Sequence, residues 1–237
     1  MTAASIKLRL SGGSGNTTPG SSLGGAISAS ATILTSNVDL NNLFDDISKA
    51  ENGAETTDYR CVYIINTGTD PFAAAEVYLS GSTNANIEIG IEGNGGTYLF
   101  DGDGVNDEFT VPAGVSLAIT SVKVGGVAQA LTTDYTVASN VVTIIVPPIV
   151  GTGNVEIQCT ADPIDVVAQT IGTETTAPTS AIYFSTPNSG VPLTVNSPSG
   201  VIAYNEYIPL WIKRTAVETI GLGMLTDVIG LVVRGTQ

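Results

Sequence analysis

The sequence predicts an all-β protein: a β-sandwich scaffold, jelly-roll-like, with one short helix and a small inserted β-module. Apolar and polar residues alternate over many short segments, and a single segment has the spacing of an amphipathic helix. Clusters of Gly, Asn and Asp separate the short segments, as in chains of strands joined by turns. In the middle of the chain the strand-like segments become short and closely spaced, and the earlier pattern then returns. This indicates an insertion into a loop of the scaffold.

The N-terminal part predicts one strand followed by a long loop. Ile6, Leu8 and Leu10 alternate with charged residues, the pattern of a half-buried strand. Residues 11–25 are rich in Gly, Ser and Thr and have few apolar anchors. We interpret them as a flexible arm or long loop, either a disordered connector or an arm that becomes ordered against a neighbouring subunit.

The helical segment comes next. Its apolar residues take the positions i, i+3, i+4 and i+7: Leu40, Leu43, Phe44 and Ile47. Asp39 is a candidate N-cap, and Gly53 is placed to end the helix.

The remaining segments predict strands. Residues 59–65 form an aromatic and β-branched run, which predicts a central strand buried on at least one face. The other candidates in the flanking parts are 75–79, 85–91, 181–185, 192–195, 206–214 and 228–234. The middle of the chain holds six at hairpin spacing: 98–100, 108–111, 117–124, 134–138, 141–146 and 154–159. We predict that 1–96 and 161–237 form one discontinuous sandwich domain, into which the β-rich module 97–160 is inserted.

Charge limits the partners of the protein. The formal net charge is −14, so a nucleic acid or an anionic lipid surface would repel the chain, and we expect neither as a partner. Charged residues make up only 13% of the chain, against roughly 25% in an average soluble domain. Neutral polar residues must then cover the surface. This suits a chain enclosed by neighbouring subunits, although isolated β-domains share the property.

Targeting signals and cysteines add two expectations. Residues 1–7 lack a basic segment followed by an apolar stretch, so we expect the protein to begin in the cytoplasm. The most apolar stretch, 220–233, contains Asp227 and is too short to span a bilayer, so we predict a buried strand there. Cys61 and Cys159 are far apart and fit neither a disulfide framework nor a metal site; both are predicted to be buried thiols.

Catalytic chemistry has little support. The chain has no histidine, the commonest general base and the usual zinc ligand, and no phosphate-binding glycine loop. We therefore predict a protein that is not an enzyme and needs no cofactor. Two carboxylates can cleave a glycosidic bond, but Glu206, Glu218 and Asp227 have no aromatic set around them and are interpreted as solvated acids.

One acidic cluster is a weak candidate for a metal site. Asp101, Asp103 and Asp107 lie close in sequence, and calcium favours such oxygen ligands. However, Val105 stands where a ligand would be expected, and no helices are predicted on either side. A hairpin turn is our preferred interpretation, and a weak divalent-cation site is the alternative.

The candidate interface residues come from two predicted strands: Tyr59, Arg60, Trp211, Lys213 and Arg214. Trp211 is interpreted as a packing residue of the core or rim in preference to a ligand platform. Lys213 and Arg214 project to opposite faces of a regular strand. They either pair with acidic residues of an adjoining subunit or face water.

Four short motifs in the flanking parts occur in an order that is also found in other proteins. Residues 43–47 (LFDDI) and 58–66 (DYRCVYIIN) are followed by 174–178 (ETTAP) and 209–215 (PLWIKRT). Their order resembles a group of tailed-bacteriophage virion proteins, with one extra threonine in the third motif. The inserted region, which begins with FDGDG at position 100, is similar to a small β-module of many phage structural proteins. These are packing motifs, and the resemblance implies no cofactor or catalytic residue.

The resemblance implies a non-enzymatic structural protein of the virion, assembled in the host cytoplasm. We expect it to decorate or cement the capsid as a symmetric oligomer, a trimer, since repeated lattices favour closed cyclic assemblies. Its partners would be other copies of itself and the major capsid protein or other virion proteins. The alternatives are a tail, neck or baseplate component, and a receptor- or glycan-binding module that uses the loops of 97–160. A capsular depolymerase is the third choice.

Overall fold

The computed structural model describes residues 5–29, 33–34, 43–44, 49–80, 86–94, 96–111, 118–138, 141–160, 162–179, 182, 184–195, 197, 199–216 and 230–236. This part of the chain is almost entirely β, which confirms the predicted fold class. Two short helices occur in it, α1 (Lys49–Gly53) and the 3-10 turn η1 (Pro19–Ser21). The strands are β1 (Ile6–Leu10), β2 (Ile33–Leu34), β3 (Thr57–Asn66), β4 (Phe72–Ser80), β5 (Asn86–Ile91), β6 (Gly96–Gly102), β7 (Glu108–Thr110), β8 (Ala118–Val124), β9 (Val127–Ala128), β10 (Tyr135–Ala138), β11 (Val141–Ile144), β12 (Gly151–Thr160), β13 (Leu193–Thr194), β14 (Val201–Ile202), β15 (Tyr207–Thr215) and β16 (Gly230–Thr236).

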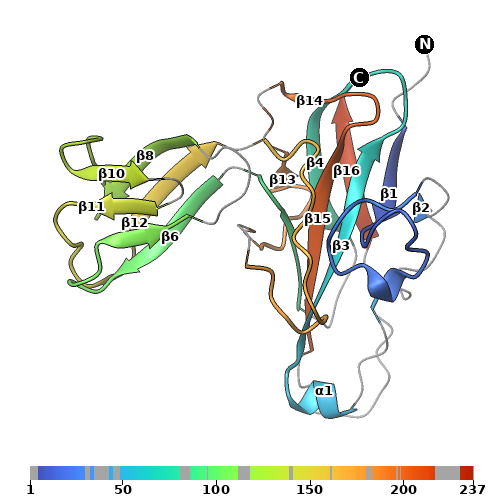
Figure 1. Ribbon diagram of the computed structural model, residues 1–237, viewed down its shortest axis with the longest axis horizontal. Coiled ribbons are helices and arrows are strands. Elements are labelled where there is room, and N and C mark those ends of the chain that lie inside the picture. The colour runs from blue at the N-terminus through green and yellow to red at the C-terminus, as the bar shows by residue number, and fades with distance from the viewer. Residues whose placement is uncertain are drawn as a thin grey trace.

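Two antiparallel sheets face each other and form what we call the sandwich (Figure 1). The first has the strand order β2-β1-β3-β15-β5. In the second, β4 pairs with β13 and β14 along one edge and with β16 along the other. The core between the sheets joins Ile64 and Ile208 of the first to Val77 and Ile202 of the second, all fully buried.

Strand β3 is the third of five in its sheet, so the prediction of a central strand at 59–65 is confirmed. Its two faces are both buried, which explains why its apolar residues run continuously instead of alternating with polar ones. Val62 and Ile64 face the sandwich core, whereas Cys61 and Tyr63 belong to a second cluster on the outer face. Two long loops cover that outer face, residues 11–28 and 162–179, together with Ile182 and Phe184.

The first of these loops decides between the two alternatives expected for residues 11–25, a long loop and a flexible arm. Residues 11–25 are a packed loop and not a flexible arm: Ser22 is fully buried, and its carbonyl accepts the backbone N–H of Cys61 at 2.8 Å. Gly24 has φ +83°, and a Cβ at this position would overlap the carbonyl oxygen of Gln169 in the second loop. Backbone hydrogen bonds and close approach fix this loop. Amino-acid composition does not reveal such contacts, because they are made by the backbone and not by side chains.

The predicted helix is also corrected. Leu43 and Phe44 lie in a turn and a bend, while residues 39–42 and 45–47 lie outside the described residues. The helix that is present, α1, ends at Gly53, the residue expected to stop the predicted one. Leu43 is fully buried in the sandwich core, and its carbonyl accepts a hydrogen bond from Arg60. Leu43 is therefore apolar because it packs into the core from a turn, and not because it lies on the buried face of a helix.

The C-terminal strands mostly follow the predictions. Within 181–185, the described residues form only an isolated bridge between Ser185 and Ile89, so no regular strand is found there. In 220–233, residues 220–229 lie outside the described part, and β16 begins at Gly230 with half-buried side chains. No helix in the described part of the chain is long and apolar enough to cross a bilayer.

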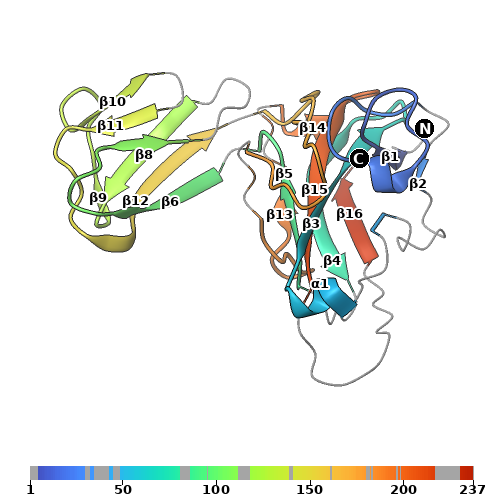
Figure 2. The same ribbon diagram turned by 60° about the horizontal axis from the view of Figure 1, so that its bottom comes forward.

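Residues 96–160, which we call the β6–β12 region, form two further sheets. Their strand orders are β6-β12-β8-β9 and β10-β11-β7, and each described strand pairs only with strands of the same region. A separate core fills the space between these sheets, with Phe109, Val142 and Ile157 among its buried residues. Figures 1 and 2 show the region set to one side of the sandwich. The division into a scaffold domain and an inserted domain stays a prediction.

Candidate functional site

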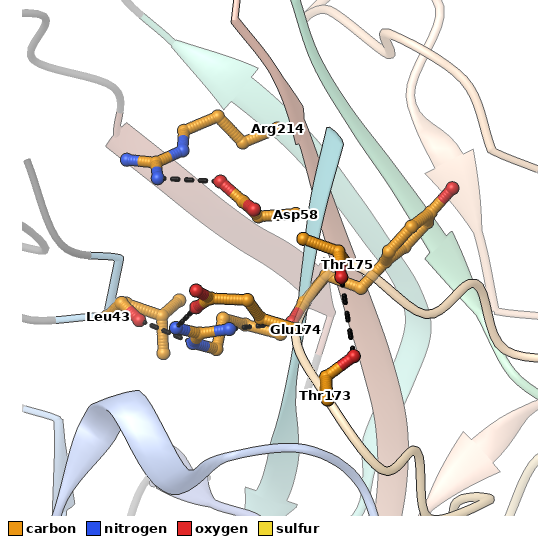
Figure 3. A network of polar contacts seen from close by, with 8 residues as sticks. Leu43, Asp58, Thr173, Glu174, Thr175 and Arg214 are labelled. Carbon is orange, nitrogen blue, oxygen red and sulfur yellow. Dashed lines mark hydrogen bonds and ion pairs between the residues drawn. The ribbon is translucent and has the colours of Figure 1, made fainter. Parts of the chain in front are cut away.

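Two buried arginines of the sandwich form a polar network with the loops around it (Figure 3). Arg214 of β15 donates from Nη2 to Oδ2 of Asp58 at 2.7 Å, and these residues are direct cross-strand partners. Arg60 of β3 forms an ion pair with Glu174 and donates from Nε to the carbonyl of Leu43 at 2.9 Å. The network thus attaches two separate loop segments to one end of the first sheet.

An aromatic ring lies against both arginines. The guanidinium carbons of Arg60 and Arg214 are 5.4 Å and 4.6 Å from the ring centroid of Phe44, within cation–π distance. The Arg60 residue is only 3% exposed, and Arg214 is buried as well. Both predicted interface arginines therefore contact their own chain. Their role in contacts with another subunit stays a prediction.

The other three candidates lie in the same sheet. Trp211 is fully buried, and its Nε1 donates to Glu92 at 2.7 Å, which confirms the interpretation as a packing residue. The ring of half-buried Tyr59 meets the ring of Phe184 edge-on at 5.8 Å. Lys213 pairs with Glu88 and lies 5.9 Å from the same Phe184 ring.

A second polar network holds the two covering loops together. The Tyr63 hydroxyl donates to the carbonyl of Gly25 at 2.6 Å and accepts the backbone N–H of Ala168 at 2.8 Å. Burial raises the pKa of this hydroxyl above its ordinary value. Glu92 accepts the backbone N–H of Gln169 with both carboxylate oxygens, at 3.0 and 3.1 Å. Each of these buried groups fixes a loop backbone against the sheet.

Both cysteines are buried, as predicted, and neither is in a disulfide. Burial, together with the charge of Glu92, raises the pKa of the Cys61 thiol well above its ordinary value. The thiolate is the nucleophilic form of cysteine, so Cys61 is held in its unreactive form.

The acidic cluster of the β6–β12 region is a turn that connects two sheets. The expected hairpin is wrong, because β6 and β7 belong to different sheets. Oδ1 of Asp103 accepts the backbone N–H groups of Val105 and Asn106 at 2.8 and 2.6 Å. These hydrogen bonds lower the pKa of Asp103.

Asp101 makes a different contact, in which Oδ1 accepts the backbone N–H of Gly153 at 2.6 Å. Among the described residues, which include Asp101, Asp103 and Asp107, no three Asp, Glu, Cys or His side chains are grouped to hold a metal ion. Of the acids considered for glycosidic cleavage, Glu206 accepts the backbone N–H of Ala203 at 2.6 Å. Glu218 and Asp227 lie outside the described residues.

The sequence analysis missed one surface feature. Nine of the twelve exposed large hydrophobic residues in the described part of the chain lie between positions 99 and 150. The segment 141–146 was expected to be a strand, but β11 ends at Ile144, shortly before Pro147 and Pro148. Proline has no N–H for a ladder hydrogen bond, so the apolar residues beside it leave the sheet. This proline pair is the signal that could have identified them.

The residues of this surface come together from two segments, 99–105 and 146–153. We call it the aliphatic tip, and its members are Leu99, Val105, Val146, Ile149 and Val150. Gly104 N–H donates to the carbonyl of Pro148 at 2.9 Å, which joins the segments. The side chain of Asn154 adds two bonds, donating to the Ile149 carbonyl at 2.7 Å and accepting the Gly102 N–H at 2.8 Å.

The tip consists of side chains that have neither a polar nor a titratable group. Its exposed side chains are aliphatic, and the carboxylates next to it accept hydrogen bonds from turn backbone. Comparison of the chain with protein-family models, with curated proteins and with solved structures finds no match.

Proposed function

We propose that this chain is a non-enzymatic structural protein of a phage virion, which decorates or cements the capsid as a symmetric oligomer, a trimer. One observation carries the proposal: the β6–β12 region has its own sheets and its own core and stands to one side of the sandwich (Figure 2). A body of this kind can present a contact surface of its own, apart from the sandwich. The motifs that resemble tailed-phage virion proteins supply the setting.

The interior of the sandwich supports a structural role. Its buried polar side chains fasten loops to sheet: Arg60 holds residues 43 and 174, Tyr63 holds residues 25 and 168, and Glu92 holds residue 169. These contacts are made inside one chain and attach its outer loops to the sheet. A rigid body with a displayed arm suits a protein that is repeated on a lattice.

A reconstruction of the purified particle tests the proposal. We expect the chain at many equivalent positions on the capsid surface, with three copies around each symmetry axis it occupies. A few copies per particle, located at the tail, neck or baseplate, would overturn decoration in favour of the tail alternative. Particles that contain no copy of the chain would overturn the virion assignment.

A deletion separates cementing from receptor binding. Gly96 and Cys159 are direct partners on neighbouring antiparallel strands, so their Cα atoms lie about 4.5–5.5 Å apart and a two-residue linker can replace residues 97–158. We expect particles carrying the shortened chain to lose resistance to heat and to keep adsorption to the host. Stable particles that no longer adsorb would favour the receptor- or glycan-binding alternative. Particles complemented with the full chain are the control.

A further inference from the structure

The side chains of the aliphatic tip are apolar, and most of their surface is exposed to solvent. Val105 is 81% exposed, Ile149 77% and Val150 78%, and Leu99 and Val146 lie beside them with most of their surface in solvent. Scattered exposed hydrophobics are normal, but a contiguous group marks a site of protein or membrane contact. The five residues come from two segments that hydrogen bonds hold together, and Val150 lies beside Gly104 where these segments meet. Leu99 of the first segment lies beside Gly153 of the second.

The tip is also built to keep its shape. Gly104 N–H to Pro148 O, Gly153 N–H to Asp101 and the two bonds of Asn154 fix both segments. Two successive prolines restrict the backbone between Val146 and Ile149. A surface that is already ordered loses little conformational entropy on binding, which favours affinity.

Charge indicates the chemistry of the partner. Residues 97–160 contain six acidic residues and one basic residue, a net charge of −5. The basic residue, Lys123, is already paired with Glu156 at 2.7 Å. Of the carboxylates next to the tip, Asp103 belongs to the same turn as Val105, and Asp101 lies just before this turn in β6. A partner that buries the tip must place positive charge around it.

We propose that the aliphatic tip docks into an apolar hollow of another virion protein, with Lys or Arg side chains around its rim. This inference rests on the proposed function, whose virion setting supplies the partner.

A second copy of the chain fits poorly as the partner. Its tip carries the same negative charge, and five of its eight basic residues are in ion pairs with acids of their own chain. An anionic bilayer would repel the acidic turn as well.

Site-specific photocross-linking in assembled particles tests the proposal. The photoreactive residue p-benzoylphenylalanine replaces Val150 in the full chain, and mass spectrometry identifies the adducts in purified, irradiated particles. The matched control carries the same residue at Val191, an exposed valine of the sandwich. We expect position 150 to cross-link to an apolar segment of a different virion protein with Lys or Arg nearby, and position 191 to give no such adduct.

Each other result of this experiment overturns the proposal. Adducts from position 150 only to copies of the same chain identify a second copy as the occupant, and adducts only to lipid identify a membrane. No adduct, in particles that contain the chain, means that the tip faces solvent. In all three cases the virion assignment stands, whereas particles without the chain overturn the proposed function itself.

A binding measurement adds a quantitative test. Chains with Val150→Asp or Val191→Asp are added to particles depleted of the protein, and occupancy is titrated. We expect Val150→Asp to weaken binding by at least about tenfold, as at a central apolar contact, and Val191→Asp by less than about twofold. Thermal unfolding of both variants checks that they are folded. Equal binding of the two folded variants would overturn the proposal.

Discussion

The sandwich and the β6–β12 region place charged and apolar side chains in opposite ways. In the sandwich, Arg60, Arg214 and Asp58 are buried, together with Glu92. In the β6–β12 region, the ion pair of Lys123 and Glu156 is partly exposed, and aliphatic side chains at the tip face solvent. The difference shows that a charged or an aliphatic side chain cannot be assigned to the surface or the interior from its residue type alone. We expect the polar networks of the sandwich to contribute to stability, whereas binding at the tip is our proposal.

The largest effect is expected from Trp211→Ala. The change removes a fully buried side chain and leaves Glu92 without the indole N–H, so we expect a loss of about 3–5 kcal/mol in the free energy of unfolding. Denaturant unfolding followed by circular dichroism measures it, because Trp211 is the only tryptophan and its fluorescence is lost. Trp211→Phe keeps most of the volume and should lose less. Equal losses would assign the effect to the hydrogen bond.

The two ion pairs offer a matched comparison. Glu174→Ala leaves Arg60 buried without its carboxylate, and we expect a loss of about 1.5–3 kcal/mol. Glu156→Ala removes the partner of Lys123, which is accessible to water, and should cost less than about 1 kcal/mol. Chemical denaturation of both variants gives the two values. A loss for Glu156→Ala as large as that for Glu174→Ala would contradict the distinction between the two regions.

Tyr63→Phe tests the network that holds the covering loops. It leaves the backbone N–H of Ala168 without its acceptor, with an expected cost of about 1–3 kcal/mol near neutral pH. Because the pKa of Tyr63 is raised in the folded protein, the unfolded chain releases its proton first, at about pH 10. The stabilisation is therefore present below about pH 10 and is lost as pH rises further.

The variant should accordingly lose less stability than the native chain between neutral pH and pH 11, measured by urea unfolding at each pH. Part of the alkaline decline remains in the variant, because burial raises the pKa of Tyr98 to about 12 and that of Tyr207 as well. Parallel pH profiles for the two chains would show that Tyr63 does not titrate differently on folding.

The smallest effect on stability is expected at the tip. Val105→Ser and Val150→Ser change side chains that are more than three-quarters exposed, so the free energy of unfolding should stay within about 0.5 kcal/mol of the native value. Thermal unfolding provides the measurement. A loss above about 1 kcal/mol would mean that the tip is a packing element of the β6–β12 region, and the comparison with the sandwich would fail.

Alternation and β-branched runs made most strands predictable. The segments at 6–10, 59–65 and 206–214 were located to within a few residues, because alternation and β-branched runs are both properties of the local chain. Leu43 and Phe44 are an example in which the local pattern gave a wrong prediction. Their spacing is helical, but Leu43 packs in the sandwich core and Phe44 lies against two arginines. The contacts come from distant strands, which a local pattern does not contain.

The same limit of local patterns applies to the candidate site residues. Arg60, Trp211 and Arg214 were named as interface candidates on two predicted strands. Their burial depends on contacts with Phe44, Glu92 and Glu174, which belong to other segments of the chain. The aliphatic tip was missed for the converse reason. An apolar run predicts burial, but the ladder ends at Ile144, before two prolines, and Val146, Ile149 and Val150 are left in solvent.

The sequence alone determined the all-β class, the central place of residues 59–65 and the burial of both thiols, because these follow from residue type and local period. The tertiary structure decided that residues 11–25 are a packed loop, that the arginines are internal and that the tip is exposed. Those outcomes depend on backbone hydrogen bonds and on contacts between segments more than a hundred residues apart, such as Arg60 with Glu174. Composition and period describe single segments and leave such pairings open.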